Sequence, residues 1–423
     1  MAGILSVFTK ERCSASQLDE CRQDALIIHI MSEKNLDFDT IIERRNTMSI
    51  KYDFAEHVGL PSDVLPLWIA DMDFKTSSYI QEALIDVVNH GIFGYSEALS
   101  EYNNTVIEYF HKKYNYDFEE NELVKTPGVV FAIATAIRAL SEEGDAVLIQ
   151  SPVYHPFAET IIRNGRKVVD NTLVYRETEN RYYVDFDDFE RKIIDNKVKL
   201  FLLCNPHNPV SRVWSVDELL QLGEICLKHN VIILSDEIHA DFTFVGKHHV
   251  FASLSPELDN NTITFTSPSK TFNLAGLQLA NIIIKNPKIR RAFVHAYKVS
   301  GYSEISIMGY ASTIAAYKNG EQWFNAVFDY IKKNVEYVKK FVDQYLPGIR
   351  VINHEATYLV WLDFRKVGLS ADELDHKIIF ESKLWLNSGR IFGKTGEGFQ
   401  RINVACPRKT LEEAMNRLKK VFG

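Results

Sequence analysis

Residues 262–273 read Thr-Ile-Thr-Phe-Thr-Ser-Pro-Ser-Lys-Thr-Phe-Asn, a short run of β-branched and aromatic residues followed at once by small polar residues around a lysine. A strand-length run of this kind is typical of a buried parallel strand whose carboxyl end faces a ligand site. The pattern recurs at 198–203, which precedes Asn205-Pro206-His207-Asn208-Pro209, and at 231–234, which precedes Asp236-Glu237-Ile238-His239. These repeated strand ends indicate where the chemistry of the protein should be sought.

Segments with the spacing of helices lie between the strand candidates. Further apolar runs occur at 146–150 and 280–284, while 129–140 and 216–229 carry apolar residues at helical spacing. Short buried strands that alternate with helices predict an α/β fold with three layers, in which helices cover both faces of a mostly parallel sheet. We expect this to be the large domain of the protein.

The C-terminal part has a different pattern. A long charged helix is predicted from about Trp323 to Tyr345, followed by strand candidates at 351–352, 358–364 and 400–404 and a last helix from Leu411. This order predicts a smaller α+β domain. We therefore expect four parts: an extension (1–30), a segment that joins the small domain (31–75), the large domain (76–315) and the small domain (316–423).

The first thirty residues are expected to be dispensable. Met31-Ser32-Glu33-Lys34 has the form of a natural start, and the apolar stretch before it is too short for a signal peptide. The hypothesis is that residues 1–30 play no part in the chemistry.

The overall composition excludes several classes of protein. There are 48 Lys and Arg against 56 Asp and Glu, giving a formal net charge of −8, so no basic surface for nucleic acid is expected. No run approaches the roughly 20 apolar residues of a membrane span. The five cysteines are odd in number and lack a CxxC pair, which favours a reducing, cytoplasmic location. No metal site is expected, since His248-His249 lacks carboxylates at ligand spacing.

The lysine of the opening stretch is a candidate nucleophile. An amine at the end of a buried strand loses solvation, which lowers its pKa and makes it reactive toward an aldehyde. The hydroxyl groups of Ser267 and Ser269, which precede the lysine, suit a phosphate. Gly128 and Val129 open the apolar helix predicted at 129–140, and its free backbone N–H groups form a second candidate site for that phosphate.

Three motifs in this order carry a family resemblance: Asn205-Pro206-His207-Asn208-Pro209, Asp236-Glu237-Ile238 and Ser267-Pro268-Ser269-Lys270. Together they resemble the fold-type I enzymes of the aminotransferase class I and II group, which use pyridoxal 5′-phosphate (PLP). The segments Trp68–Phe74 and 151–154, with His239 and 269–273, are similar to the cystathionine β-lyase and cystalysin branch, which cleaves carbon–sulfur bonds. The resemblance extends from about Met31 to the C-terminus.

The resemblance implies roles for the residues at the strand ends. Lys270 is expected to form the Schiff base with PLP and then to move the Cα proton of the substrate. Asp236 is expected to pair with the ring nitrogen, Asn208 to donate to the ring 3-oxygen, and Tyr154 to stack on the ring. Their ordinary alternatives are a surface lysine, a helix N-cap, a turn asparagine and a structural aromatic residue.

The resemblance also implies a partner subunit and a substrate contact. Tyr95, in Phe93-Gly94-Tyr95-Ser96, matches the tyrosine that reaches the phosphate from the neighbouring subunit, so a homodimer is expected; the alternative is an ordinary loop tyrosine. Arg401 is expected to hold the substrate α-carboxylate in a two-point contact. Alternation along 399–405 places Arg401 and Asn403 on one face of a strand.

Two positions depart from the pattern of many aminotransferases. His239 stands where those enzymes have a tyrosine, and it favours the lyase branch. Gln278 replaces the arginine that many of them carry eight residues after the lysine, so the phosphate would rest more on neutral donors.

The sequence thus predicts a PLP-dependent carbon–sulfur β-lyase that releases a thiol, pyruvate and ammonia from cystathionine or a related sulfur amino acid. An aminotransferase that uses the same residues is the first alternative. A regulatory binding role, combined with the same fold in some relatives, is the second. The identity of the leaving thiol is not predicted.

Overall fold

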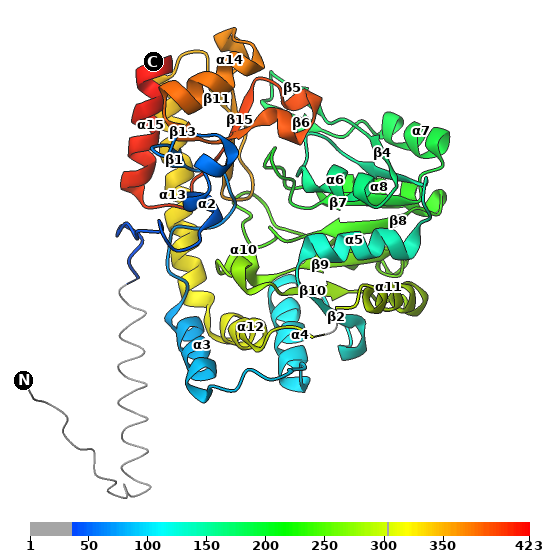
Figure 1. Ribbon diagram of the computed structural model, residues 1–423. Helices are drawn as coiled ribbons and strands as arrows, with labels where there is room; N and C mark the ends of the chain where they lie inside the picture. Colours follow the sequence, from blue (N-terminus) through cyan, green and yellow to red (C-terminus); the bar gives the residue numbers. More distant parts are fainter. Residues whose placement is uncertain (1–35, 303) are drawn as a thin grey trace, which may run out of the picture. The chain divides into compact units, whose positions relative to one another are not determined.

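A computed structural model describes residues 36–302 and 304–423. The chain divides into a unit of Met1–Asp37 and a unit of Phe38–Gly423. The helices and strands named below all belong to the second unit (Figure 1). The expected extension at residues 1–30 lies outside the described residues.

The large sheet has seven strands in the order β2-β10-β9-β8-β7-β3-β4. Neighbouring strands are parallel except at β10, which is antiparallel to both β2 and β9. The parallel strands therefore end at one edge of the sheet, where the polar residues that follow them meet. The strands are β2 (Leu123–Thr126), β3 (Ala146–Ile149), β4 (Lys167–Asp170), β7 (Leu200–Cys204), β8 (Ile232–Asp236), β9 (Thr262–Thr266) and β10 (Ala280–Ile283).

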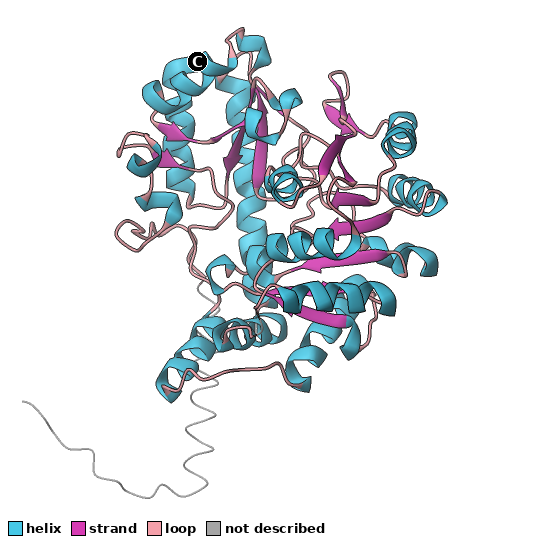
Figure 2. Cartoon of the chain, turned by 45° about the vertical axis from the view of Figure 1, so that its right-hand side comes forward, coloured by secondary structure: helices cyan, strands magenta, loops and turns pink. Residues whose placement is uncertain are grey.

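Helices cover both faces of this sheet, as the two ribbon views show (Figures 1 and 2). Alternate residues of β7 belong to different cores: Leu200 and Leu202 pack with residues of α5, α6 and α11, while Phe201 and Leu203 pack with residues of α7 and α8. A strand buried on both faces needs an unbroken apolar sequence, which explains the runs that predicted the fold. The helices are α2 (Ile50–Asp53), α3 (Ser78–His90), α4 (Ser100–Tyr114), α5 (Val129–Leu140), α6 (Pro156–Arg163), α7 (Phe186–Asn196), α8 (Val216–Lys228), α9 (Pro256–Asp259), α10 (Pro268–Thr271), α11 (Pro287–Val299), α12 (Ile307–Asn319), α13 (Glu321–Tyr345), α14 (Ala371–His376) and α15 (Arg408–Phe422).

The C-terminal strands form a separate antiparallel sheet in the order β11-β12-β15-β14. Its strands are β11 (Arg350–Val351), β12 (Leu359–Asp363), β14 (Asn387–Ser388) and β15 (Phe399–Asn403). Two strand pairs complete the fold: β5 (Val174–Arg176) with β6 (Arg181–Tyr183), and β1 (Leu65–Pro66) with β13 (Leu384–Trp385). The β1–β13 pair joins the N-terminal segment to the C-terminal part of the chain.

The predicted α/β class is confirmed, and most of the predicted elements are found with small shifts at their ends. Helix α5 has the expected bounds, whereas α15 begins at Arg408, three residues before the expected start at Leu411. The antiparallel direction of β10 and the short strands β5, β6, β13 and β14 had no signal in the sequence pattern. The division at residues 75/76 and 315/316 stays a prediction. In the described part of the chain, no helix has both the length and the apolar character needed to cross a bilayer.

Candidate active site

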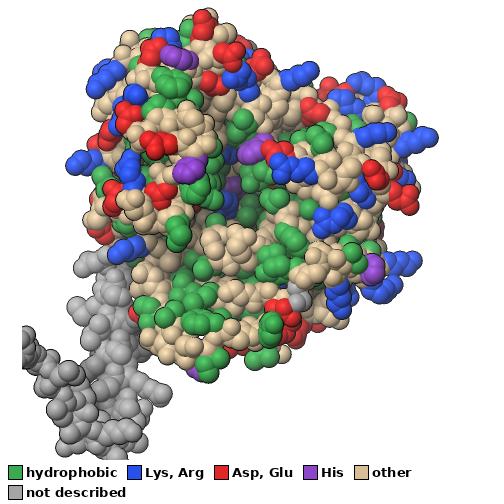
Figure 3. Space-filling model, viewed as in Figure 1, with side chains coloured by type: hydrophobic (Ala, Val, Ile, Leu, Met, Phe, Trp, Pro, Cys, Tyr) green, Lys and Arg blue, Asp and Glu red, His purple; other side chains and the backbone are tan. Residues whose placement is uncertain are grey.

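The carboxyl ends of β7, β8 and β9 open into a cavity of about 440 Å³. On the face of the molecule drawn in Figure 3, a hollow contains basic and histidine side chains among hydrophobic ones. Nine of the ten predicted site residues line the cavity: Gly128, Val129, Tyr154, Asn208, Asp236, Ser267, Ser269, Lys270 and Arg401. Six stretches that are far apart in the sequence therefore contribute to one site.

Lys270 lies in the short helix α10, which directly follows β9. Its Nζ donates a hydrogen bond of 2.6 Å to the carbonyl oxygen of Ala70. Desolvation lowers the pKa of the amine to about 8, in spite of the opposing effect of the Asp71 carboxylate. An amine with this pKa is unprotonated in a useful fraction near neutral pH, as a nucleophile or a general base requires.

Asp236 is the last residue of β8, and its side chain is only 5 % exposed. The carboxylate accepts a hydrogen bond of 3.1 Å from the backbone N–H of Ile238. Burial raises the pKa of Asp236 to about 7, since one backbone hydrogen bond compensates little of the lost hydration. A buried carboxylate that has no cationic side chain in contact among residues 36–302 and 304–423 fits a ligand that brings a positive charge to this point.

The amino end of α5 forms the part of the cavity most suited to an anion. Gly128 caps this helix with φ of +149°, a backbone conformation that favours glycine, and the first N–H groups of α5 have no acceptors within the helix. A Cβ atom at Gly128 would lie 3.9 Å from Oε1 of Gln278, so the glutamine that replaces the expected arginine borders the same place. The anion would meet helix N–H groups and neutral side chains there.

Ser267 and Ser269 also line the cavity, but the hydroxyl of Ser267 already has two partners. It donates to the carbonyl oxygen of Leu279 at 2.7 Å and accepts from the backbone N–H of Ser269 at 3.1 Å. Ser267 therefore caps α10 and links the start of this helix to Leu279, the residue before β10. The sequence alone indicated only that its hydroxyl suits a phosphate.

Arg401, on β15, reaches the cavity from the small sheet and is 4 % exposed. Its Nη1 donates to Oδ1 of Asn208 at 2.9 Å, and its Nη2 donates to the carbonyl oxygen of Trp68 at 3.0 Å and to Oδ1 of Asn387. Burial lowers the pKa of Arg401 to about 10, and its Nε is a buried donor without a partner among the described residues. A buried guanidinium that forms no ion pair within the described part of the chain is suited to bind an anionic ligand.

The contact with Arg401 also orients the side chain of Asn208. Because Oδ1 of Asn208 accepts from Arg401, its amide Nδ2 remains the donor for a ligand in the cavity. The role predicted for Asn208 is compatible with this orientation.

The two predicted tyrosines have contrasting positions. Tyr154 lines the cavity, and burial and the neighbouring Asp236 raise the pKa of its hydroxyl. Tyr95 is 96 % exposed and does not line the cavity of its own chain. His239 lines the cavity as well, and burial together with the charges of Lys270 and Arg401 lowers its pKa, so the imidazole is neutral.

Several residues of the cavity were not predicted individually. Trp68 lines it, stacks on Trp385 with ring centroids 4.4 Å apart, and has a buried Nε1 without a partner among the described residues. Asn387 and His155 line it too. The resemblance of 68–74 to the lyase branch was a signal for Trp68, whereas Asn387 enters the site only through the pairing of β14 with β15.

The comparisons with known proteins agree with this geometry. The family model for aminotransferase class I and II matches residues 62–418. The chain is 39% identical to cystathionine beta-lyase PatB of Bacillus subtilis over 385 residues, which cover 91% of this chain and 99% of that protein.

Two solved structures show the same fold. Cystalysin from Treponema denticola, which contains a pyridoxal 5′-phosphate cofactor, has a TM-score of 0.88 and 36% identity, with 92% of this chain and 98% of that chain covered. A PLP-bound protein from Clostridium difficile 630, described as a candidate aminotransferase, has a TM-score of 0.90 and 39% identity, with 92% and 100% covered. The resemblance read from the motifs is confirmed.

Proposed function

Since this chain belongs to the aminotransferase class I and II family, we propose that it is a PLP-dependent carbon–sulfur β-lyase. It releases a thiol, pyruvate and ammonia from cystathionine or a related sulfur amino acid. The observation that carries this proposal is the single cavity in which the Lys270 amine, the Asp236 carboxylate and the Arg401 guanidinium meet. The choice of a lyase rests on relatives that are named cystathionine beta-lyase and cystalysin.

The residues of the cavity fit PLP in charge and in chemistry. The free N–H groups of α5 suit its phosphate, and the Lys270 amine suits its aldehyde. The isolated carboxylate of Asp236 suits its ring nitrogen, and Nδ2 of Asn208 suits its 3-oxygen. When bound, PLP supplies an electron sink for the negative charge that develops at Cα of the substrate.

Lys270 serves as the base in this proposal. With a pKa of about 8 its amine both accepts and releases a proton near neutral pH, and the Ala70 carbonyl fixes the position of Nζ. Lys270 takes the proton from Cα, the electron pair left at Cα forms a Cα=Cβ bond, and the Cβ–S bond breaks with its own pair leaving on the thiolate. Water then hydrolyses the released 2-aminoacrylate to pyruvate and ammonia. Next to a cationic ring nitrogen, Asp236 would be held in its charged form and would keep a proton on that nitrogen.

Arg401 orients the substrate. Its guanidinium is held by Asn208, Trp68 and Asn387, so its position is set before the ligand arrives. A substrate carboxylate compensates the buried positive charge and turns Cα toward Lys270.

The assay that decides between lyase and aminotransferase uses the full chain loaded with PLP and given cystathionine. Pyruvate formation without an added keto acid is expected, whereas transfer of the amino group to the cofactor would identify an aminotransferase. Lys270→Ala should abolish both the visible absorbance band of the loaded protein and pyruvate formation, while Lys167→Ala, an exposed lysine of β4, should change neither. A Lys270→Ala protein that kept its pyruvate formation would refute the proposal.

The active unit in this proposal is a homodimer to which Tyr95 contributes across the interface. The support is the resemblance around Tyr95 and its 96 % exposure in the single chain. Mixing Lys270→Ala and Tyr95→Ala proteins tests it, because a hybrid dimer regains one complete site and random mixing restores about a quarter of the activity. No restoration after subunit exchange would refute the crossing. The cytoplasmic location inferred from cysteine usage stays a prediction.

A further inference from the structure

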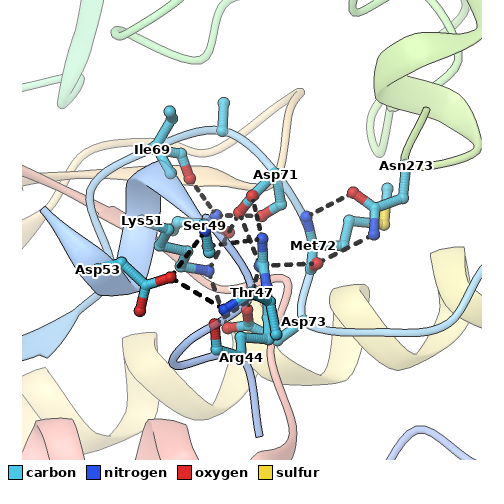
Figure 4. A network of polar contacts seen from close by, with 12 residues as sticks. Arg44, Thr47, Ser49, Lys51, Asp53, Ile69, Asp71, Met72, Asp73 and Asn273 are labelled. Carbon is cyan, nitrogen blue, oxygen red and sulfur yellow. Dashed lines mark hydrogen bonds and ion pairs between the residues drawn. The ribbon is translucent and has the colours of Figure 1, made fainter. Parts of the chain in front are cut away.

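Four charged side chains form a network around the segment at 69–73 (Figure 4), and Ile69 and Ala70 of this segment line the active-site cavity. This charge cluster consists of Arg44, Lys51, Asp71 and Asp73. Arg44 binds Asp71 at 2.6 Å and Asp73 at 2.7 Å, and Lys51 binds Asp73 at 2.8 Å and Asp71 at 3.4 Å. Each cation therefore contacts both carboxylates, and the formal charges of the cluster cancel.

The cluster lies largely out of solvent. Lys51 is 1 % exposed and Asp73 is 5 % exposed, while Arg44 and Asp71 retain about a fifth of their side-chain surface. Burial alone would raise the pKa of Asp71, but the hydrogen bonds from Arg44 and the charges of Lys51, Arg44 and Lys270 together lower it. Asp71 is therefore a fixed negative charge at neutral pH.

The segment that carries the two aspartates is also tied to the catalytic elements. Asn273, three residues after Lys270, accepts from the backbone N–H of Met72 and donates to the carbonyl oxygens of Met72 and Phe74. On the other side, Nδ2 of Asn403 donates to the carbonyl oxygens of Ile69 and Asp71 at 2.7 Å each. Asn273, which follows α10, and Asn403, on β15, thus hold the same short segment at 69–74.

The carbonyl of Ala70 connects this segment to the reacting amine. It accepts hydrogen bonds from Nζ of Lys270 at 2.6 Å and from the hydroxyl of Tyr358 at 3.0 Å. The carboxylate of the neighbouring residue, Asp71, raises the pKa of the Lys270 amine more than the carboxylate of Asp236 does.

We propose that the charge cluster is a positioning device for Lys270: it anchors the segment that presents the Ala70 carbonyl, and it keeps the Asp71 carboxylate charged beside the amine. The inference rests on the proposed function in one respect, that Lys270 is the reacting amine. Arg44 and Lys51 act through Asp71 and Asp73 and contact no cavity-lining atom in the described contacts, so they are positioning residues. Asp71 tunes the amine through its charge.

The charged and titratable groups that act on Lys270 are few. Asp71 and Asp236 favour the ammonium form, whereas Arg401 opposes it, and the buried His239 is neutral. On the other side of the cluster, Tyr52 has its pKa raised by burial and by Asp73, so it stays uncharged. Removing the Asp71 charge therefore leaves one fewer carboxylate to stabilise the ammonium form of Lys270.

Two substitutions should shift the pKa of the Lys270 amine in opposite directions. Asp71→Asn removes the negative charge and should lower the pKa of Lys270 by about one pH unit. Arg44→Gln removes a cation that offsets this charge and should raise the pKa by a smaller amount. A role limited to holding the fold together would not produce shifts of opposite sign.

The measurement is competitive acetylation of the cofactor-free full chain across a pH series, with the Lys270 peptide quantified by mass spectrometry. This readout needs neither PLP nor substrate. Asp53→Asn is the matched control, because Asp53 accepts the backbone N–H groups of Asn46, Thr47 and Ser49 and orders the same loop without contributing to the cluster. Its labelling midpoint should equal that of the unmodified protein.

Opposite shifts in Asp71→Asn and Arg44→Gln, with none in Asp53→Asn, would support the proposal. Equal midpoints in all folded variants, or shifts in one direction only, would overturn it. If Arg44→Gln does not fold, Asp71→Asn still decides, since its amide oxygen can accept one of the two hydrogen bonds that Arg44 donates to Asp71. Failure of the proposed function would instead appear as a Lys270 residue that does not capture PLP in the unmodified protein.

Discussion

Asp236 is predicted to destabilise the cofactor-free protein, and Asp236→Asn is the substitution that reveals it. The asparagine has the shape of the aspartate and can still accept the hydrogen bond from Ile238. It has no charge to desolvate. The substitution should therefore stabilise the cofactor-free fold while it weakens the binding of a ligand with a cationic ring nitrogen.

The magnitude follows from the buried position of the carboxyl group. Its pKa rises from 3.8 to about 7 in the folded chain, because burial penalises the charged form. The folded state then binds the proton more tightly than the unfolded state does. The free energy of unfolding therefore falls as the pH rises from about 4 to about 7 and Asp236 must be buried in its charged form. This loss reaches at most about 4 kcal/mol above that range.

Urea unfolding of the cofactor-free protein at a series of pH values measures this loss. The difference in the free energy of unfolding between Asp236→Asn and the unmodified protein should grow by about 3 kcal/mol from about pH 5 to about pH 8. Asp195→Asn, an exposed position in α7, should show no such growth. PLP titrations of the same proteins should show about 100-fold weaker binding in Asp236→Asn, corresponding to about 3 kcal/mol.

One outcome would refute the reasoning. If Asp236→Asn is less stable than the unmodified protein at about pH 8, or if the difference does not depend on pH, the carboxylate is not paying a desolvation penalty. It would then be an ordinary structural residue at the end of β8.

Three further predictions follow from the contacts of single residues. Arg401→Lys should raise the substrate KM by about 10- to 100-fold in steady-state kinetics, since lysine cannot make the two-point contact with a carboxylate; an unchanged KM would contradict a role in substrate binding. Asp73→Asn should lower the free energy of unfolding by about 3 kcal/mol in urea, since it leaves the buried Lys51 without its nearest carboxylate. A loss no larger than that of the exposed control Glu159→Gln would contradict this account. Lys270→Met should stabilise the cofactor-free protein by at most about 3 kcal/mol at neutral pH, because the folded amine has its pKa lowered from 10.5 to about 8. The cost of burying the charged amine declines as the pH rises above about 8 and is gone above about pH 10.5. Thermal unfolding at neutral and alkaline pH checks the sign, and a stabilisation that persists at alkaline pH would contradict it.

The sequence by itself determined the strands and helices that form because of the pattern of neighbouring residues. Apolar runs buried on both faces predicted the strands β3, β7, β8, β9 and β10, and the polar residues after them predicted the edge that carries the site. Lys270 could be named in advance because it lies among small hydroxyl residues shortly after such a run, and Asp236 because the family resemblance marks it shortly after another. Gly128 could be named because a glycine before an apolar helix leaves free N–H groups in the open.

Only the tertiary structure decided which distant residues complete the site. Asn387 and the orientation of Asn208 depend on Arg401, which comes from a different sheet. No pattern in the sequence indicated that the side chains of Arg44 and Lys51 would be buried or partly buried, because a long charged side chain at an irregular position is usually solvated. Their burial results from the way the N-terminal segment folds against the segment at 68–73, and pairing between segments far apart in the chain is set by packing and not by local preference.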